Sequence, residues 1–538
     1  MVVIDKSKRG DLKTRLVMKE TDLDKLRSHL LQVDGKERAA FALVGKTELT
    51  GYLELYVHSL ILPDDKDYCE QSPVVVEPKP EFVLETMAGF AASRVSGFLH
   101  IHSHPFCSRA SFSGIDNHYF PGMVESLRHY LIVSGKEKSF LFTTMVWGHS
   151  ESGFAARCFA PDGSLFATVE EIKVVGKHGV RVVRQFESMD GEEEDEPLSG
   201  RFQRQVEFLG ENGQRQIERT RLVICGVGGL GSFVVACARG LGFREITLID
   251  PDILEETNLN RFQGATRADV GKPKVEVVAA VTKLFDPDIK VNPVFARVED
   301  PVAHEAILPA DFIVNCLDDD SARVEVQILA SLHLKPLLDL GSGIILEKGT
   351  RAVQEMGGQA ALYFPGGPCL FCQGLDPSTI VSREIRQVQR AAGYIQGTDE
   401  TPPSVVTLNA VTAGLGLQIV INYLTGFVEA PAYLHYDLLH NCSTQLNFTR
   451  RSDCPICGDA GIEGRGEEIM GLPIHKSAKV SLPTAKITPL KETELLPAAA
   501  PQESSNVSAP VSMYKFLRAE MARIRTWLRR EYHATVQR

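Results

Sequence analysis

The sequence has no excess of basic residues: 58 Lys and Arg stand against 69 Asp and Glu, and the formal net charge is −11. This balance argues against nucleic acid as the main partner. We find no basic-flanked apolar segment at the start of the chain and no uninterrupted apolar run of the roughly 18 residues that a membrane helix needs. We therefore expect neither secretion nor a membrane span, and we expect a cytoplasmic protein.

Cysteine is too sparse for a disulfide framework. The 11 cysteines are spread over 538 residues, and several stand inside apolar segments, so reduced thiols and metal ligands fit them better than disulfides. An apolar fraction of 43% and a charged fraction of 24% are typical of a soluble globular protein. The length allows two or three domains, each with its own core.

Two changes of composition divide the chain. An acidic, turn-rich run predicts a linker at 177–200, and a stretch rich in Pro, Ala, Ser and Lys predicts a flexible linker at 461–510. They delimit domains at 1–176 and 201–460. Apolar residues at helical spacing, with arginines between them, predict an amphipathic helix at 511–538. We expect that helix to dock on the protein itself or on a partner, with an acidic membrane surface as the alternative.

The first domain concentrates metal-binding residues in one short segment. His102 and His104 are followed by Asp116, which together give a divalent metal three ligands and leave one position for water. Such a metal lowers the pKa of its water to roughly 7. Upstream, Glu37 is the candidate general acid and base, and Ser113 would polarise the carbonyl oxygen of the substrate.

This pattern of an upstream Glu, His-x-His-Pro and Ser-x-x-Asp resembles the JAMM (MPN) family of zinc isopeptidases over roughly residues 10–176. The resemblance implies an α-β-α domain that cuts peptide or isopeptide bonds after the C-terminal tail of a ubiquitin-like protein. It also implies that His102, His104 and Asp116 hold a catalytic zinc ion. The alternative is an inert domain in which the histidines make only local contacts.

The second domain opens with a β-α-β pattern. The apolar run 220–225 leads into a turn that carries Gly226, Gly228 and Gly231, and the next strand ends at Asp250. Glycines let the backbone approach a phosphate, the helix N-terminus supplies free N–H groups, and the acid can bind a ribose hydroxyl. By itself this motif fits a nicotinamide-dependent oxidoreductase equally well.

Charged residues further along favour a triphosphate. Arg261, Lys274 and Asp318 are unneeded for hydride transfer, but they suit ATP and Mg²⁺, because charge on the reacting phosphate must be neutralised. Over roughly residues 200–460 the sequence resembles the ThiF/MoeB family of adenylating enzymes, whose fold is Rossmann-like. The residues that the resemblance places around the nucleotide are Gly226, Gly228, Gly231, Asp250, Asp252, Asn258, Arg261, Lys274 and Asp318.

Two further features follow from the same resemblance. Arg204 matches an arginine that reaches the ATP of a neighbouring subunit, so we expect a homodimer. Residues 373–441 contain no cysteine, although thioester-forming members of the family keep their nucleophile there. We therefore expect the activated carboxylate to remain an adenylate, with Cys442 as the only nearby thiol that could replace that nucleophile.

Four cysteines form two Cys-x-x-Cys motifs, namely Cys369, Cys372, Cys454 and Cys457. Four thiolates around zinc make a closed structural site. The ThiF/MoeB family carries such a pair of motifs, and a long loop between them adds little to the cost of closure, because that cost rises only with the logarithm of length. A redox-active pair is the alternative.

We therefore interpret the chain as a bacterial, bifunctional α/β protein. A zinc protease would process or deconjugate a ubiquitin-like or sulfur-carrier protein, and the second domain would adenylate its C-terminal carboxylate. The implied cofactors are ATP, Mg²⁺ and two zinc ions, one catalytic and one structural. A conjugating enzyme is a further candidate partner. The alternatives are adenylation of a peptide or small carboxylate without such a carrier, and a scaffold with vestigial sites.

Overall fold

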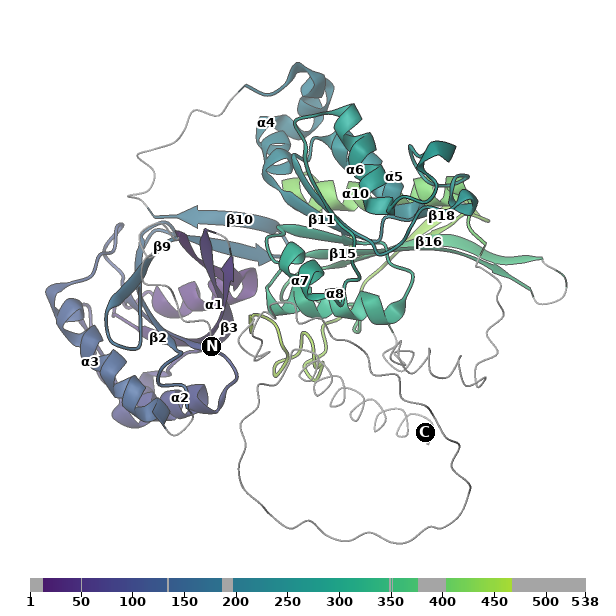
Figure 1. The fold of residues 1–538 in the computed structure, drawn as a ribbon. Helices are drawn as coiled ribbons and strands as arrows, with labels where there is room; N and C mark the ends of the chain where they lie inside the picture. Colours follow the sequence, from purple (N-terminus) through teal and green to yellow (C-terminus); the bar gives the residue numbers. More distant parts are fainter. Residues whose placement is uncertain are drawn as a thin grey trace, which may run out of the picture.

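The structure is a computed structural model, which describes residues 13–49, 51–132, 135–185, 197–347, 350, 352–375 and 403–466. Within these ranges the chain forms two eight-stranded sheets, one in each half, and a small two-stranded sheet. Figure 1 shows the two halves side by side. The helix predicted at 511–538 lies outside the described residues, as does most of the linker predicted at 461–510.

The N-terminal sheet curls until its first strand meets a late one. Its order is β1-β3-β2-β6-β7-β8-β9-β10, and β1 also pairs with β9, which closes the sheet on itself. The strands are β1 (Lys13–Lys19), β2 (Ala39–Leu49), β3 (Tyr52–Ile61), β6 (Gly97–His104), β7 (Leu141–Gly148), β8 (Phe154–Phe159), β9 (Leu165–Gly176) and β10 (Gly179–Arg184). The separate hairpin consists of β4 (Tyr68–Ser72) and β5 (Val75–Pro78).

Helices lie on both faces of this sheet. Helix α1 (Glu20–Leu30) packs on one face, while α2 (Pro80–Ala92) and α3 (Gly114–Leu131) pack on the other. Because side chains alternate along a strand, Leu99 of β6 belongs to the core shared with α1, and the neighbouring Phe98 belongs to the core shared with α2 and α3. The same alternation sets the direction of every functional side chain on β6.

The predicted starting points of both linkers are wrong. We expected a linker from residue 177, but β10 (Gly179–Arg184) pairs antiparallel with β9, so the N-terminal sheet extends through it. We also expected flexible chain from residue 461, but residues 461–466 are mostly buried and Gly466 bridges to Lys46 of β2. Strand β10 continues a hairpin from the neighbouring β9, whereas residues 461–466 have a partner far along the chain that local composition does not reveal.

The second sheet is doubly wound. Its order is β13-β12-β11-β14-β15-β16-β17-β18; the strands from β13 to β15 are parallel and the rest are antiparallel. The strands are β11 (Arg221–Cys225), β12 (Glu245–Ile249), β13 (Lys290–Val294), β14 (Phe312–Asn315), β15 (Leu337–Leu346), β16 (Val353–Tyr363), β17 (Tyr433–Asp437) and β18 (Cys442–Leu446).

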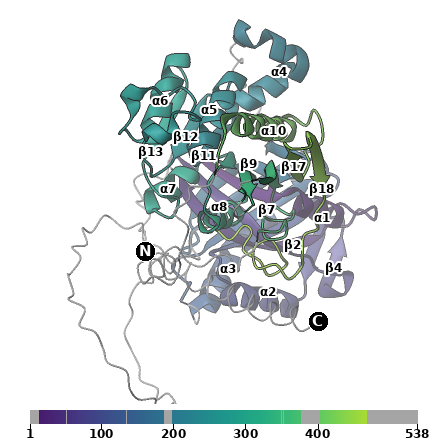
Figure 2. The ribbon, with the colours of Figure 1, turned by 90° about the vertical axis from the view of Figure 1, so that its right-hand side faces the viewer.

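Helices cover both faces of this sheet as well, as Figure 2 shows from the side. One face carries α4 (Gln203–Arg219), α5 (Gly229–Leu241), α6 (Lys274–Phe285) and α10 (Val406–Thr425). The other carries α7 (Pro301–Ile307) and α8 (Asp320–Leu332). This is the α/β fold with a Rossmann-like β-α-β start that the sequence predicts.

Helix α10 corrects the expectation that no segment could span a membrane. Among the described residues it is the helix long and apolar enough to do so, by length and composition alone. However, 56% of its most apolar window is buried inside the protein, and Ala413, Leu417 and Val420 belong to the core of the second half. A helix buried on most sides needs apolar residues all round, which explains its composition.

Buried ion pairs join the two halves. Glu54 of β3 lies 3.6 Å from the ammonium group of Lys335, and Lys173 of β9 lies 2.7 Å from Asp311, which also binds Arg221 at 2.8 Å. The side chains of Glu54 and Lys335 are only 2% and 4% exposed. Burial alone would raise the pKa of Glu54, but Lys335 and Lys173 outweigh it and lower this pKa to about 2.

An apolar contact lies beside these charges. Leu334, from the loop between α8 and β15, packs among Val17, Tyr56 and Val175 of the N-terminal half. Its φ of 48° lies in the left-handed region, which costs a non-glycine residue of order 1–3 kcal/mol. The surrounding packing holds this conformation, because Leu334 is only 1% exposed.

We predict that Glu54→Gln destabilises the protein by about 3–5 kcal/mol, because it leaves Lys335 buried without its counter-charge. Urea unfolding measures the change. The control is Glu429→Gln, which removes a surface ion pair with Lys177 at 2.6 Å and should cost no more than about 1 kcal/mol. Equal costs for the two variants would contradict the importance of the buried pair.

The effect should depend on pH in a defined direction. The folded-state pKa of Glu54, about 2, lies below its unfolded value of about 4.3, so its ionisation stabilises the fold above that value. The contribution is lost as the pH falls toward 2. The difference between the wild type and Glu54→Gln should therefore shrink through this window in unfolding experiments.

Candidate functional site

The histidines and the aspartate of the N-terminal half converge on one point. His102 and His104 lie two residues apart on β6 and therefore face the same side of the sheet, the side that α3 covers. Asp116, in the first turn of α3, places Oδ1 3.2 Å from Nε2 of His102. One possible ligand atom from each of these residues lies within 4.8 Å of the others.

A capping box orients Asp116. The hydroxyl oxygen of Ser113, the N-cap of α3, accepts the backbone N–H of Asp116 at 3.1 Å, and Oδ2 of Asp116 accepts the N–H of Ser113 at 2.7 Å. Burial would raise the pKa of Asp116, but His102 and Ser113 lower it well below its usual range. The carboxylate is therefore ionised, with one oxygen used by the cap and the other directed at His102.

Glu37 lies beside this cluster. Its Oε1 is 3.8 Å from Nε2 of His104, and the residue is 9% exposed. Burial raises the pKa of Glu37 to about 7. A carboxyl group with such a pKa can both accept and donate a proton near neutral pH, which is what a general acid and base requires.

Sequence reasoning missed the residues that position Glu37. The backbone N–H of Arg38 donates to Oγ of Ser103 at 2.9 Å, and the N–H of Ser103 donates to the carbonyl of Arg38 at 3.0 Å. The Arg38 guanidinium binds both oxygens of Asp34, at 2.7 and 2.9 Å. Glu37 is thus tied to the strand that carries the histidines. The only local signal was the serine between His102 and His104.

In the second half, the glycine turn occupies the carboxyl end of β11. Strand order changes direction between β11 and β14, and ligands bind doubly wound sheets at such a switch point. Gly226 has a φ of 86°, and a Cβ there would lie 2.9 Å from the carbonyl carbon of Cys316. A Cβ on Gly231 would overlap the carbonyl oxygen of Gly226. Gly228 is the N-cap of α5.

Asp250 holds this turn from the end of β12. Its Oδ2 accepts the N–H of Val227 at 2.7 Å, and Oδ1 accepts the N–H of Asp252 at 2.8 Å. Burial raises the pKa of Asp250. Asp252 is exposed at the same edge and pairs with the ammonium group of Lys274 at 2.8 Å. Two predicted nucleotide residues, Asp252 and Lys274, are therefore in direct contact.

Arg261, which follows β12 in the sequence, packs against the first residue of α5, Gly229. A Cβ on Gly229 would lie 3.1 Å from its Cγ, and its guanidinium donates to the carbonyl of Thr257 at 2.7 Å. The predicted Asn258 has a local role, since its Oδ1 accepts the N–H of Glu255 at 3.1 Å and closes a short 3-10 turn. The structure brings Arg261 to the glycine turn and leaves Asn258 one turn earlier in the chain.

Asp318 follows β14 and is exposed. Three residues that the sequence did not single out hold its loop. Asp339 accepts Nδ2 of Asn315 at 2.7 Å and pairs with Arg323 at 3.4 Å, and Nε of Arg323 donates to the carbonyl of Leu317 at 2.8 Å. Burial raises the pKa of Asp339. Arg204 is exposed in the first turn of α4, so its predicted role in a neighbouring subunit stays a prediction.

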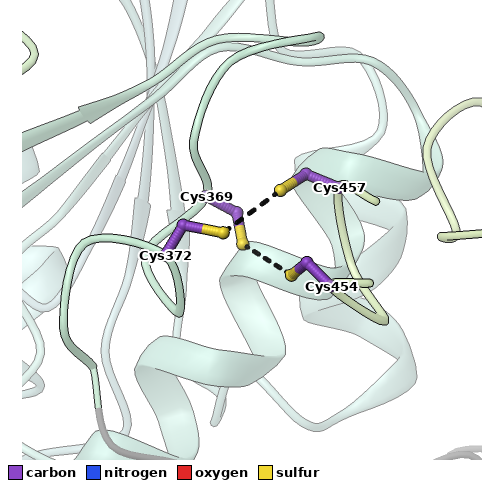
Figure 3. Close-up of side chains that lie close together, drawn as sticks. All are labelled: Cys369, Cys372, Cys454 and Cys457. Atoms are coloured by element: carbon purple, nitrogen blue, oxygen red, sulfur yellow. Dashed lines mark hydrogen bonds between the residues drawn. The ribbon is translucent and has the colours of Figure 1, made fainter. Parts of the chain in front are cut away.

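The four cysteines gather into one cluster, shown in Figure 3, in which three are buried and Cys372 is partly buried. The sulfur of Cys369 lies 3.6 Å from that of Cys454, and the sulfur of Cys372 lies 3.6 Å from that of Cys457. These separations exceed the roughly 2.05 Å of a disulfide. Each close pair joins one motif to the other, whereas a redox-active Cys-x-x-Cys pairs within its own motif. Cys442, in contrast, is exposed on β18.

Comparison with known proteins identifies the second half. Residues 202–456 match the model of the ThiF family. The chain is 27% identical to the SAMP-activating enzyme E1 of Haloferax volcanii, over 48% of this chain and 87% of that protein. It is also 27% identical to the sulfur carrier protein adenylyltransferase of Thermus thermophilus, over 48% of this chain and 90% of that protein.

Among solved structures, Escherichia coli MccB with AMPCPP and MccA matches at 23% identity, with a TM-score of 0.41, over 49% of this chain and 76% of that one. The family match and the sequence relatives define the class: residues 202–456 form a ThiF/MoeB-type adenylyltransferase domain. This confirms the prediction for the second half and argues against a nicotinamide-dependent oxidoreductase.

We predict that Gly231→Ala destabilises the protein by about 1–3 kcal/mol, because the added methyl group overlaps the carbonyl oxygen of Gly226 and the turn must shift. Thermal unfolding measures the effect. The matched control is Gly228→Ala, where a Cβ meets no atom within 4 Å and φ is −79°. A stability equal to that of the wild type for Gly231→Ala would show that the turn is not as tightly closed as described.

Proposed function

We propose that the second half activates the C-terminal carboxylate of a ubiquitin-like or sulfur-carrier protein as an acyl-adenylate. The observation that carries this proposal is the set of charged residues around the glycine turn at the switch point of an adenylyltransferase domain. The relatives named for SAMP activation and for a sulfur carrier protein support this choice of substrate.

The chain supplies positioning and charge to this reaction. Arg261 and Lys274 would hold the phosphates at the N-terminal ends of α5 and α6, where helix N–H groups also favour anions. Asp318 would bind Mg²⁺, which neutralises charge on the phosphates when it is present. The carboxylate attacks the α-phosphorus and pyrophosphate leaves. Arg204 would complete the site of a second copy, so we infer a homodimer.

We propose that the activated carboxylate remains an acyl-adenylate and does not form a thioester with this protein. Cys442 is the candidate thiol that follows the cysteine-free segment 373–441. It lies on β18, the edge strand of the sheet, and β16 and β17 separate it from the parallel strands. On the same hairpin, Nδ1 of the exposed His440 donates to Oδ2 of Asp437 at 2.7 Å. A thiol on this edge strand, away from the parallel strands whose ends carry the glycine turn, is poorly placed to form a thioester.

For the N-terminal half, we propose a zinc-dependent peptidase or isopeptidase that acts on the same carrier. His102, His104 and Asp116 fit zinc, because two imidazoles and an ionised carboxylate face one point. Bound zinc would polarise a water molecule for attack on a carbonyl. Glu37 would take the proton of that water and deliver it to the leaving amine. The hydroxyl proton of Ser113 remains available for the carbonyl oxygen, because the cap uses only its oxygen as an acceptor.

For the cysteine cluster we propose a structural zinc site. The four sulfurs fit the metal, since all lie within 4.8 Å of one another and Cys369, Cys454 and Cys457 are at most 2% exposed. A closed set of four thiolates leaves no position for a substrate. Its role is therefore to tie the chain after β16 to the chain after β18.

We predict that Asp318→Ala lowers ATP–pyrophosphate exchange about 10²–10³-fold, because one ligand for the metal that screens the phosphates is lost. The assay uses a carrier protein that ends in Gly-Gly with a free carboxylate. The control is Asp24→Ala on α1, an exposed aspartate of the other half with the same charge change. Exchange at the wild-type rate in Asp318→Ala would refute the assignment.

The same assay separates the substrate classes. A carrier with an amidated C-terminus should not support exchange, because it has no carboxylate to activate. Exchange with a short peptide that ends in Gly-Gly, at the rate given by the folded carrier, would favour the alternative of a peptide substrate. Absence of exchange with every carboxylate, while ATP still binds, would favour a scaffold with a vestigial site.

We predict that Glu37→Gln retains zinc but loses about 10²–10⁴-fold in hydrolysis, because only the proton transfer is removed. The substrate is a Gly-Gly carrier extended by a short peptide, cleavage is followed by mass spectrometry, and metal content is measured in parallel. The control is Glu48→Gln on β2, whose side chain is exposed. Cleavage at the wild-type rate in Glu37→Gln would contradict the role of Glu37.

A further inference from the structure

Residues 458–466, here called the clamp segment, begin at the second Cys-x-x-Cys motif and end on the N-terminal half. At their start, the N–H of Gly458 donates to the carbonyl of Cys454 at 2.8 Å, and the N–H of Ile462 donates to the carbonyl of Ile456 at 2.8 Å. The fold of the cysteine motif therefore determines where the clamp segment begins.

The end of the clamp segment fits closely against β2 and β3. Gly466 forms a parallel bridge with Lys46, and a Cβ on Gly45 would overlap the carbonyl oxygen of Arg465. Gly464 and Gly466 have φ values of 72° and 66°, and a Cβ on Gly464 would lie 2.7 Å from the carbonyl oxygen of Val57. Only glycine permits both this backbone conformation and this close approach.

Glu463 fixes the middle of the clamp segment to both halves. Its carboxylate accepts the hydroxyl of Tyr363 at 2.9 Å and the N–H of Gly366 at 3.1 Å, and it lies 3.7 Å from the ammonium group of Lys19. Its carbonyl oxygen is 2.7 Å from Nδ1 of His58 on β3. Glu463 is only 4% exposed, so these contacts replace water.

The clamp segment also contacts the last turn of α8. The N–H groups of Gly464 and Gly466 donate to the carbonyls of Ser331 and Leu332, at 3.0 and 2.9 Å. The loop that follows α8 carries Lys335, the partner of Glu54. The clamp segment and the buried ion pairs therefore belong to one continuous interface.

We propose that metal binding at the four cysteines holds the clamp segment in place and thereby fastens β2 and β3 of the N-terminal half to the adenylyltransferase domain. The proposal rests on the structural zinc proposed above. Strand β2 begins two residues after Glu37, and its first residue, Ala39, lies opposite His102 in the sheet. Metal at the cysteines therefore stabilises the strands on which the candidate peptidase site is built, in the other half of the chain.

Hydrogen exchange of the full chain, read by mass spectrometry together with metal content, tests the proposal. Cys454→Ser should lose the metal of the cysteine site and raise exchange about tenfold or more in the clamp segment and in the parts of β2 and β3 that it contacts. The control Cys442→Ser, which changes an exposed cysteine of the same half, should leave these amides unchanged.

A second variant covers the case in which Cys454→Ser does not fold. Gly466→Val keeps the cysteines but overlaps the backbone of Lys46, so it should retain the metal and raise exchange in β2 and β3. Metal loss in Cys454→Ser without a change in β2 and β3, or normal exchange in Gly466→Val, would overturn the proposal. A wild-type protein without metal at the cysteines would refute the zinc site and its control of the clamp segment, whereas the adenylation proposal is decided separately by pyrophosphate exchange.

Discussion

The pairing of charges buried between the two halves is the constraint on which the rest of the structure depends. A carboxylate as buried as Glu54 is costly unless cations face it, and two do so at 3.6 Å: Arg15 from its own half and Lys335 from the other half. Lys173 and Asp311 repeat this arrangement in the opposite direction, since here the cation belongs to the N-terminal half. Any hinge motion at this interface would unpair buried charges. The left-handed Leu334 conformation is tolerated at the same place because packing holds it.

Each candidate site lies on strands whose positions are fixed by the sheets or by the interface between the two halves. The two histidines converge because residues two apart on β6 share a face, and Asp116 meets them because a capping box sets the first turn of α3. In the other half, the turns after β11 and β14 meet at the change of strand order, where Gly226 touches Cys316. The side chains that do chemistry are few, and most of their neighbours serve to hold them.

The sequence predicted what local spacing encodes and missed what depends on distant partners. The glycine turn and the cysteine motifs are short patterns, and their residues are adjacent in the structure. The capping box between Ser113 and Asp116 is equally local but was not predicted. The closure of β1 on β9 and the docking of residues 461–466 have no local signature, since each needs a partner far along the chain. Strand β10 was missed for a different reason: it forms a hairpin with the neighbouring β9 inside a segment that was assigned to the acidic linker. The expectation that no segment is apolar enough to span a membrane failed at helix α10 for a related reason. Burial of most of its surface against the rest of the fold removes the amphipathic pattern by which a helix that packs on a core is recognised.

The fixed interface limits how the two proposed activities can cooperate. If a carrier is trimmed in one half and adenylated in the other, its tail must leave one site and enter the second. Domain closure cannot shorten that path, because closure would separate Lys173 from Asp311 and Lys335 from Glu54. A carrier would therefore pass between the sites by dissociation or by reaching a neighbouring copy. The interface between the two halves would then keep both sites on one molecule, and it makes the stability of each half depend on the other.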